Sequence, residues 1–441
     1  MVDRNNIARL PGQAALAPIS PLLLALFVQA CGPSDDRATD GADAGWTAVT
    51  DTVADTITVG TVSGQVWESD AELVSELSIG VFDGAPEYQF GNVRAIAVDT
   101  DGRMYVLDAH GPVLRTYAPD GTWLRDIGRD GEGPGEYKQP DSGLAVLPDG
   151  RIALRDPGNA RISIFSPEGE YLDSRPMAGS FNTSNQMVAD ISGSLLTPIV
   201  KNLGASVLQW QRGMARYRAD GTVDTIDTPD WGYEEAIISG ESENSSSTRR
   251  VPFTPRQITA YSGQGYFVVG ISDRHRFTLL KPGGLALTIE RDFEPVAVDP
   301  AEASAARERV TANFRDNFPG WRWNGPNIPD VKPAYQAFVI AQDGRIWVHL
   351  HAPSERYMDG AEQRAEEKRL GRPVNPYREP VRFDVFEPSG EYLGEVAAPD
   401  GFVLRPWPVM RGNTVWAIVK DELDVARLHR FRLEFKAEAQ R

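Results

Sequence analysis

The chain has 441 residues, of which 41 % are hydrophobic and 24 % are charged, with 41 Gly and 32 Pro. This length is ample for a large buried core. The 62 acidic residues outnumber the 45 Lys and Arg and give a net charge of −17, which argues against nucleic acid as a partner. The chain contains a single cysteine, so disulfide frameworks, thiolate zinc clusters and iron–sulfur centres are excluded.

The first 30 residues have the features of an export signal. Two arginines provide a positive start, and an apolar run over 21–30 ends directly before Cys31. This run is too short to span a bilayer but fits a secretory signal peptide. Residues 28–31 (VQAC) resemble a bacterial lipoprotein box, in which the cysteine is acylated after cleavage. We therefore expect a signal peptide over 1–30 and lipidation at Cys31, which would anchor the exported chain to a membrane of the cell envelope, either the outer membrane or the periplasmic face of a membrane. The alternative is an ordinary secretory signal with an incidental cysteine.

The segment after the cysteine has the composition of a linker. Residues 32–59 are rich in Asp, Thr, Ala and Gly and contain one aromatic residue, Trp46. Such a segment buries too little apolar surface to offset the entropy lost on ordering. We therefore expect a flexible acidic tether over 31–70, followed by a folded region over 71–441.

A repeat of paired glycine turns runs through the folded region. Gly102 in VDTDGRMYVLD is followed 19 residues later by Gly121 in APDGTWL, and Gly150 in VLPDGRIALRD is followed by Gly169 in SPEGEYL at the same spacing. Glycine in such turns permits the positive φ of a tight hairpin. Weaker copies begin near residues 193, 265, 344 and 411, so the pattern predicts six units.

Each unit is expected to form a four-stranded sheet. The runs between turns, such as 104–106 and 346–348, are continuously apolar, as is typical of strands covered on both faces. Six such sheets stacked radially make an all-β, six-bladed β-propeller. The sixth unit lacks a fourth strand, whereas 73–82 precedes the first unit, so we expect this N-terminal strand to close blade six. A pair of β-sandwiches is the alternative, but it does not explain the fixed spacing.

Three segments resemble NHL-type six-bladed propellers, in particular bacterial lipoproteins with a GxGPGE loop between blades. They are 90–108 (FGNVRAIAVDTDGRMYVLD), 128–137 (GRDGEGPGEY) and 165–172 (FSPEGEYL). The resemblance covers about 71–441 and implies a propeller fold in an extracytoplasmic location. Members of this family include both binding scaffolds and enzymes, so the fold by itself does not define the function.

The long connections are predicted at the end of the propeller opposite the glycine turns. Helices are expected over 301–318, after blade four, and over 356–372, within blade five. They either cover the channel mouth as a lid or pad the edges of the blades. Trp321 and Trp323 follow the first helix and are candidates for stacking on a ligand, with packing at the rim as the alternative.

Four histidines at this end are candidate metal ligands: His110, His275, His349 and His351. Converging neutral imidazoles form zinc sites with an open position for water. The family resemblance implies zinc held by histidine in some lyases, and calcium held by Glu, Asp and Asn in lactonase-type propellers. The alternative is a set of unrelated surface and loop histidines, since the chain has no HExxH motif.

Three carboxylates are candidate channel or turn residues. Asp108 and Asp156 end the second predicted strand in blades one and two, and Asp273 follows the corresponding strand in blade four. A carboxylate at such a position can accept backbone N–H bonds of the next turn and fix that turn. Because Asp108 and Asp156 recur with the blade, this structural role is favoured over ligation for both.

We interpret the chain as a membrane-anchored extracytoplasmic binding or scaffold propeller. Its long-loop face would be presented to a small molecule, a glycan or a partner protein. The alternative is a metal-dependent lyase or lactonase-type hydrolase that acts at the channel mouth with zinc or calcium. The sequence leaves open whether the chain is an enzyme.

Overall fold

The computed structural model describes residues 45–179, 183–202 and 211–436, which all fall in one unit of the chain, 37–441. The expected signal peptide and Cys31 lie outside the described residues. Within the described ranges, no helix is long and apolar enough to cross a membrane.

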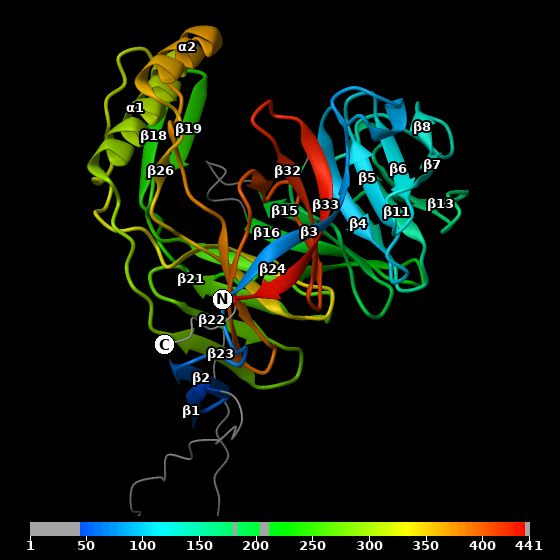
Figure 1. Ribbon diagram of the computed structural model, residues 1–441, viewed down its shortest axis with the longest axis horizontal. Helices are drawn as coiled ribbons and strands as arrows, with labels where there is room; N and C mark the ends of the chain where they lie inside the picture. Colours follow the sequence, from blue (N-terminus) through cyan, green and yellow to red (C-terminus); the bar gives the residue numbers. More distant parts are fainter. Residues whose placement is uncertain (1–44, 180–182, 203–210, 437–441) are drawn as a thin grey trace, which may run out of the picture. The chain divides into compact units, whose positions relative to one another are not determined.

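Three of the six repeat units form separate four-stranded antiparallel sheets, as the glycine pattern predicts (Figure 1). The first consists of β4 (Val93–Val98), β5 (Met104–Asp108), β6 (Val113–Tyr117) and β7 (Trp123–Ile127). The second consists of β10 (Leu144–Val146), β11 (Ile152–Asp156), β12 (Arg161–Phe165) and β13 (Tyr171–Pro176). The third consists of β14 (Val188–Ala189), β15 (Leu195–Asn202), β16 (Gln211–Tyr217) and β17 (Val223–Asp227).

The fourth unit is larger than predicted because two N-terminal strands join it. Its own strands are β20 (Gln257–Tyr261), β21 (Phe267–Ile271), β22 (Arg276–Leu280) and β23 (Ala286–Arg291). Beyond them lie β2 (Thr56–Ser63), which pairs parallel with β23, and β1 (Thr47–Val53), which pairs antiparallel with β2. The fourth sheet therefore has six strands.

The last two units share one nine-stranded sheet, which differs from the expected separate four-stranded sheets. The fifth unit contributes β24 (Tyr335–Ile340), β25 (Ile346–Leu350), β28 (Arg382–Phe386) and β29 (Tyr392–Ala397). The sixth contributes β30 (Phe402–Val403), β31 (Val409–Arg411), β32 (Thr414–Lys420) and β33 (Ala426–Phe435). Between them lies β3 (Ala71–Ile79), which pairs antiparallel with β33 and makes a short parallel contact with β29. The N-terminal strand thus has the partner expected for it, and it also links the two units.

The glycines of the repeated turns have the positive φ that the sequence pattern predicts for them. Gly102, Gly121, Gly150 and Gly169 all have φ between 84° and 90°. Residues other than glycine rarely adopt this backbone conformation, so these turns favour glycine strongly.

The tether expected over 31–70 is corrected by the structure for the described residues. β1 and β2 form a hairpin there, and Val59 of β2 is buried in the core. The amides of Val66 and Trp67 then donate to carbonyls at the start of β29, at 2.9 and 2.8 Å. The segment is ordered because the outer edges of the fourth and fifth units supply backbone partners, which composition does not reveal.

Two helices are present where they were expected. α1 (Pro300–Asn317) follows the fourth unit, and α2 (Gly360–Leu370) interrupts the fifth. The side chain of Asp299 caps α1, and Asp359 forms a capping box at α2 with Glu362, which satisfies the first free amides of each helix. α2 buries none of its residues, whereas α1 buries one in every four along a single face.

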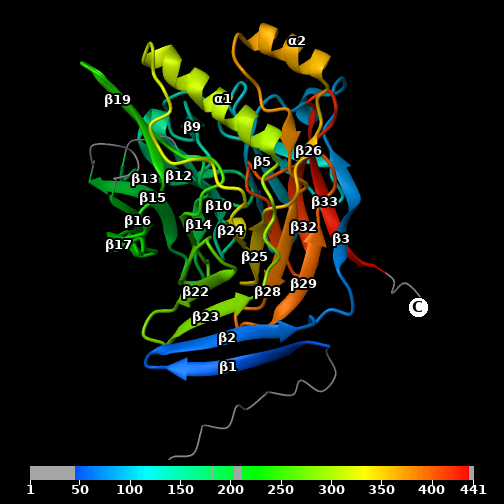
Figure 2. The same ribbon diagram turned by 90° about the vertical axis from the view of Figure 1, so that its left-hand side faces the viewer.

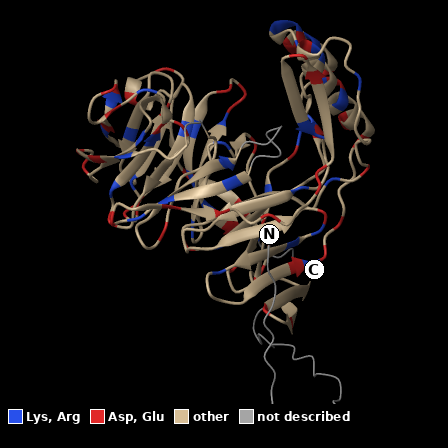
Figure 3. Ribbon diagram, turned by 180° about the vertical axis from the view of Figure 1, so that it is seen from behind, with Lys and Arg blue, Asp and Glu red and all other residues tan. Residues whose placement is uncertain are grey.

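Small hairpins accompany the helices (Figure 2). They are β18 (Ile237–Ser242) with β19 (Ser245–Arg250), and β26 (Glu355–Arg356) with β27 (Tyr377–Arg378); a further short pair, β8 (Arg129–Asp130) with β9 (Glu136–Tyr137), follows the first unit. Val310 and Phe314 of α1 pack with Ile238 of β18. α1 therefore covers the β18–β19 hairpin. Charged residues of both signs are interspersed on α2 (Figure 3).

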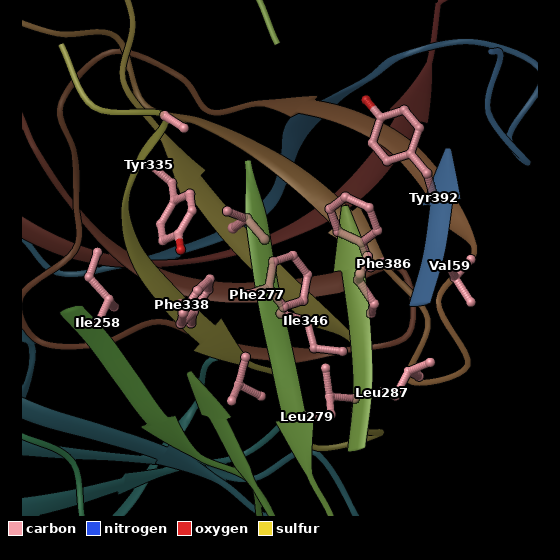
Figure 4. Close-up of a cluster of buried hydrophobic side chains, with 14 of the residues drawn as sticks. Val59, Ile258, Phe277, Leu279, Leu287, Tyr335, Phe338, Ile346, Phe386 and Tyr392 are labelled. Carbon is pink, nitrogen blue, oxygen red and sulfur yellow. The ribbon is translucent and has the colours of Figure 1, made fainter. Parts of the chain in front are cut away.

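The cores lie between neighbouring sheets. The largest cluster joins the fourth and fifth units through side chains such as Phe277, Phe338 and Phe386, and it includes Val59 from the N-terminal hairpin (Figure 4). The ring centroids of Phe277 and Phe386 are 5.4 Å apart in an edge-to-face arrangement, which is a favourable geometry for aromatic pairs. Burial on both faces of the inner strands explains their continuous apolar sequence.

Candidate functional site

A large cavity of about 1680 Å³ lies among the sheets, and every repeat unit contributes an edge strand to its wall. These six strands are β4, β10, β14, β20, β24 and β31. Backbone hydrogen bonds connect units across the wall: the amide of Ile191 donates to the carbonyl of Gly263 at 2.9 Å, and that of Gln342 donates to Met410 at 2.8 Å. Residues 228–230 and 232–235 also line the cavity, so it reaches the long connections.

Three arginines from these connections line the cavity near one another: Arg250, Arg256 and Arg405. Burial lowers the pKa of Arg256, and repulsion from Arg250 lowers it further, while Glu235 acts in the opposite direction. Burial and repulsion from Arg256 lower the pKa of Arg405 to about 10. Both guanidinium groups therefore stay charged at neutral pH, although each is held in unfavourable surroundings.

The backbone and neighbouring side chains fix two of these arginines. The amide of Arg256 donates to Ser272 Oγ at 3.1 Å, and its guanidinium donates to the carbonyl of Gln336 at 2.7 Å. The Arg405 guanidinium lies 3.7 Å from the ring centroid of Trp407 and donates to the carbonyl of Ser184 at 2.8 Å. Arg405 lines the cavity, where the protein surrounds its guanidinium group while part of its side chain stays accessible to solvent.

Carboxylates also line this part of the cavity, and two of them have basic partners. Arg250 forms an ion pair with Glu235, and Lys201 forms one with Asp227. In the ranges that the structure describes, neither Arg256 nor Arg405 forms an ion pair. The cavity thus contains two guanidinium groups whose charge no carboxylate of the described chain neutralises directly.

A buried ionic cluster lies at the base of α1. Lys332 Nζ lies 3.2 Å from Glu302 Oε2 of α1 and 3.0 Å from Glu379 Oε1, and it donates to Ser354 Oγ at 2.7 Å. The Lys332 side chain is fully buried. These contacts fix the start of α1 to the loop that follows the fifth unit's second strand.

Glu379 connects this cluster to the cavity wall. Its Oε2 accepts hydrogen bonds from the Ala352 amide at 2.9 Å and from Gln336 Nε2 at 3.1 Å, and it lies 3.0 Å from His351 Nδ1. Burial would raise the pKa of Glu379, but the contact with His351, the Ala352 amide and the charge of Lys332 together hold it below its usual value. Gln336 lines the cavity, so a chain of polar contacts through Lys332 and Glu379 connects α1 with the cavity wall.

The structure does not bring the four candidate histidines together as a metal site. His110 is exposed after β5, His275 Nε2 lies 2.8 Å from Asp384 Oδ2, His349 is buried in β25, and His351 contacts a carboxylate after that strand. Over 45–179, 183–202 and 211–436, no three His, Cys, Asp or Glu residues form a group that could hold a metal ion. None of the four lines the cavity.

The candidate carboxylates have structural contacts. Asp108 accepts hydrogen bonds of 2.7 and 2.8 Å from two consecutive amides just before β4, and Asp156 accepts bonds of 3.0 and 2.9 Å from the two equivalent amides before β10. Each therefore fixes the entry into its own sheet, in line with the favoured structural interpretation. Asp273 is partly exposed and pairs with its neighbour Arg274 at 3.7 Å. None of the three lines the cavity.

The two candidate tryptophans pack against α1 rather than in the cavity. The Trp321 ring stacks on Phe314 with centroids 4.4 Å apart, and its Nε1 donates to the carbonyl of Ser239 at 2.7 Å. The Arg307 guanidinium of α1 lies 4.4 Å from the Trp323 ring centroid. The structure therefore favours the alternative, in which both rings serve packing.

Sequence reasoning missed the two arginines that distinguish this cavity. Arg256 and Arg405 occupy irregular segments outside the repeated turns, and no motif surrounds them. Lys332 was equally inconspicuous, because it is a single lysine between Pro329 and Pro333 with no motif around it. Ser272, one position beyond the one that the repeated aspartate occupies in the first two units, accepts a hydrogen bond from the amide of Arg256.

No family model matches the chain, and no curated protein matches it. Among solved structures, it is similar to a protein of the DUF4221 family from Bacteroides vulgatus, with 11 % identity, a TM-score of 0.51, and coverage of 84 % of this chain and 99 % of that one. A gluconolactonase from Xanthomonas campestris matches with 12 % identity, a TM-score of 0.38 and coverage of 82 % and 99 %. A virginiamycin B lyase from Staphylococcus aureus matches with 10 % identity, a TM-score of 0.35 and coverage of 81 % and 99 %. The likeness to the first structure extends over most of both chains, and the fold of this protein is accordingly mostly β and propeller-like.

Proposed function

We propose that this chain is an exported, lipid-anchored six-bladed β-propeller that binds a small-molecule ligand in its central cavity. The observation that carries the proposal is the cavity of about 1680 Å³ with an edge strand from every repeat unit in its wall. Radial stacking of six sheets leaves such a space along the axis. Ligand pockets in proteins commonly measure about 300–1,000 Å³, so this cavity is large enough for a sizeable organic molecule.

In this proposal the six repeat units are the six blades. β31, β32, β33 and β3 make up the sixth, so that strands from both ends of the described chain share a blade. The antiparallel pairing of β3 with β33, from Ala71 opposite Phe435 to Ile79 opposite Leu428, supports this assignment. A ring closed by this strand pairing leaves no unpaired strand edge between the first and last blades, which favours a rigid cavity wall.

Export and lipidation rest on the N-terminal sequence. The apolar run before Cys31 and the VQAC box support cleavage and acylation at that residue. Labelling cells with an alkyne analogue of palmitate tests this directly: the wild-type chain should incorporate the label in the membrane fraction, and Cys31→Ser should not. Equal labelling of both chains would refute lipidation at Cys31.

Ligand binding in the cavity is tested with a neutral fluorogenic probe, N-phenyl-1-naphthylamine, on the chain from residue 32 onward. This chain retains the whole described unit. Thr259 of β20 lines the cavity, so Thr259→Trp should fill part of the space and weaken probe binding. Thr225→Trp, on the exposed outer strand β17, is the matched control and should bind like wild type. Equal affinity in all three proteins would refute binding in the cavity.

No observation in the described residues favours the metal-dependent lyase or lactonase alternative over ligand binding. The candidate histidines occupy separate environments, and no described group of three ligands is present to hold zinc or calcium. The same holds for glycan stacking on Trp321 and Trp323, since both rings contact α1.

A further inference from the structure

The geometry points to an organic anion as the ligand of this cavity: we propose that Arg256 and Arg405 bind its acidic group and that Trp407 supports its apolar body. This inference rests on the proposed function and specifies the ligand class for the same cavity. All three side chains line the cavity wall. Arg256 directly precedes β20, and the other two lie in the connection before β31. Arg256 and Arg405 are close enough for their charges to repel each other.

The charge balance of the two arginines favours an added anion. Arg250 has Glu235 as its partner, but the guanidinium groups of Arg256 and Arg405 donate only to backbone carbonyls within the described ranges. Two like charges that repel each other in partly desolvated surroundings destabilise the empty site. A bound anion would neutralise this repulsion, so the free energy released on binding includes relief of a penalty already present in the free protein.

The groups at the site also define the shape of the ligand. A guanidinium group is a planar fork that binds carboxylate, sulfonate or phosphate through two parallel hydrogen bonds. The Arg405 guanidinium lies 3.7 Å from the Trp407 ring centroid, which restrains its orientation. The ring of Trp407 packs against the core of the fifth and sixth units but stays partly exposed, and its exposed part can contact a planar apolar group. An aromatic or polycyclic acid satisfies both requirements, whereas an inorganic anion satisfies only the first.

Acidic residues near the arginines limit which anions fit. Glu234 is exposed at the cavity wall, and Glu235 is already engaged by Arg250. A ligand with several negative charges would meet repulsion from Glu234 once its first acidic group is bound. A single acidic group attached to an apolar body is therefore the best match.

The test uses two fluorogenic probes that differ by one acidic group: 8-anilino-1-naphthalenesulfonate and the neutral N-phenyl-1-naphthylamine. The wild-type chain from residue 32 onward should bind the sulfonate about tenfold or more tightly than the neutral probe, because a hydrogen bond to a charged group contributes that much to affinity. Arg256→Gln and Arg405→Gln should each remove most of this preference while leaving the affinity for the neutral probe nearly unchanged. Arg94→Gln, at an exposed position of β4 outside the cavity, is the charge-matched control and should keep the preference.

The outcomes separate the two proposals. Binding of neither probe to the cavity would refute the proposed function. Equal binding of both probes, unaffected by Arg256→Gln and Arg405→Gln, would refute the anion site alone. Displacement of the sulfonate by millimolar inorganic sulfate as readily as by 1-naphthoate would also overturn the proposal, because it would show a site for any small anion. Arg405→Lys keeps the positive charge, so this variant should retain part of the preference for the sulfonate. Circular dichroism of each variant verifies that it is folded.

Discussion

His349 provides a quantitative test of how the structure responds to acid. Its side chain is buried in β25, and its ring centroid lies 5.6 Å from that of Phe383. Burial, with a further contribution from repulsion by His351, lowers the pKa of His349 to about 4, against an ordinary value of 6.5; Glu379 acts weakly in the opposite direction. In the unfolded chain the same side chain takes up a proton near its ordinary pKa. The free energy of unfolding that depends on His349 is therefore fully present above pH 6.5 and is lost as the pH falls toward 4, by about 3 kcal/mol in total.

The assay is urea unfolding of the chain from residue 32 onward at several values between pH 7.5 and pH 4.5, compared with His349→Gln. The amide of Gln does not titrate, so the variant should lose less stability over this interval, by about 2–3 kcal/mol. His110→Gln replaces an exposed histidine and controls for the loss of an imidazole elsewhere in the chain. If wild type and His349→Gln lose stability in parallel as the pH falls, the interpretation of His349 as a buried neutral imidazole is wrong.

Three further predictions concern stability. Asp384→Ala leaves Arg291, which donates to it at 3.0 Å, without its carboxylate in a buried site; we expect a loss of about 3–5 kcal/mol in urea unfolding, and a loss below 1 kcal/mol would contradict the role given to this contact. Lys332→Met leaves Glu302 and Glu379 buried without their cation, so α1 should become sensitive to limited proteolysis before the sheets do; uniform resistance would refute its role in holding α1. Deletion of residues 1–63 removes β1 and β2 and uncovers β23, so it should lower the melting temperature by several degrees; an unchanged value would show that the hairpin contributes nothing to stability.

The repeating part of the fold was accessible from sequence because its causes are local. The conformation of Gly102 depends on a turn of four residues, and the apolar run after it depends on burial of one strand. Asp108 and Asp156 recur at the same distance from these turns, and both accept backbone amides mainly from the segment before the first strand of their sheet, with the amide of His110 in the next turn as a further donor to Asp108. The two helices were likewise predictable from their polar composition and their place between strands.

The N-terminal hairpin was missed because its stability comes from elsewhere in the chain. Residues 47–63 contain Val49, Val53, Ile57, Val59 and Val62 but no Leu, Met or aromatic residue, and their many Asp, Thr, Ala and Gly residues look like a linker by composition. Their order depends on parallel pairing with β23, more than 220 residues away, where Thr56 lies opposite Ala286 and Thr61 opposite Arg291. Sequence composition measures what a segment can bury by itself, not the backbone partners that another sheet edge offers it.

The pair of arginines in the cavity was missed for a related reason, which concerns charge. A net charge of −17 describes the molecule as seen from a distance, where solvent and salt screen individual groups beyond about 10 Å. A ligand in the cavity experiences instead the few charges within that distance, and there Arg256 and Arg405 are not matched by carboxylates of the described chain. These two residues are 149 positions apart in the sequence, so neither net charge nor any local motif could reveal that they meet. An acidic protein can therefore present two guanidinium groups without a carboxylate partner to its ligand, and the comparison of a charged probe with its neutral analogue measures that local field rather than the global one.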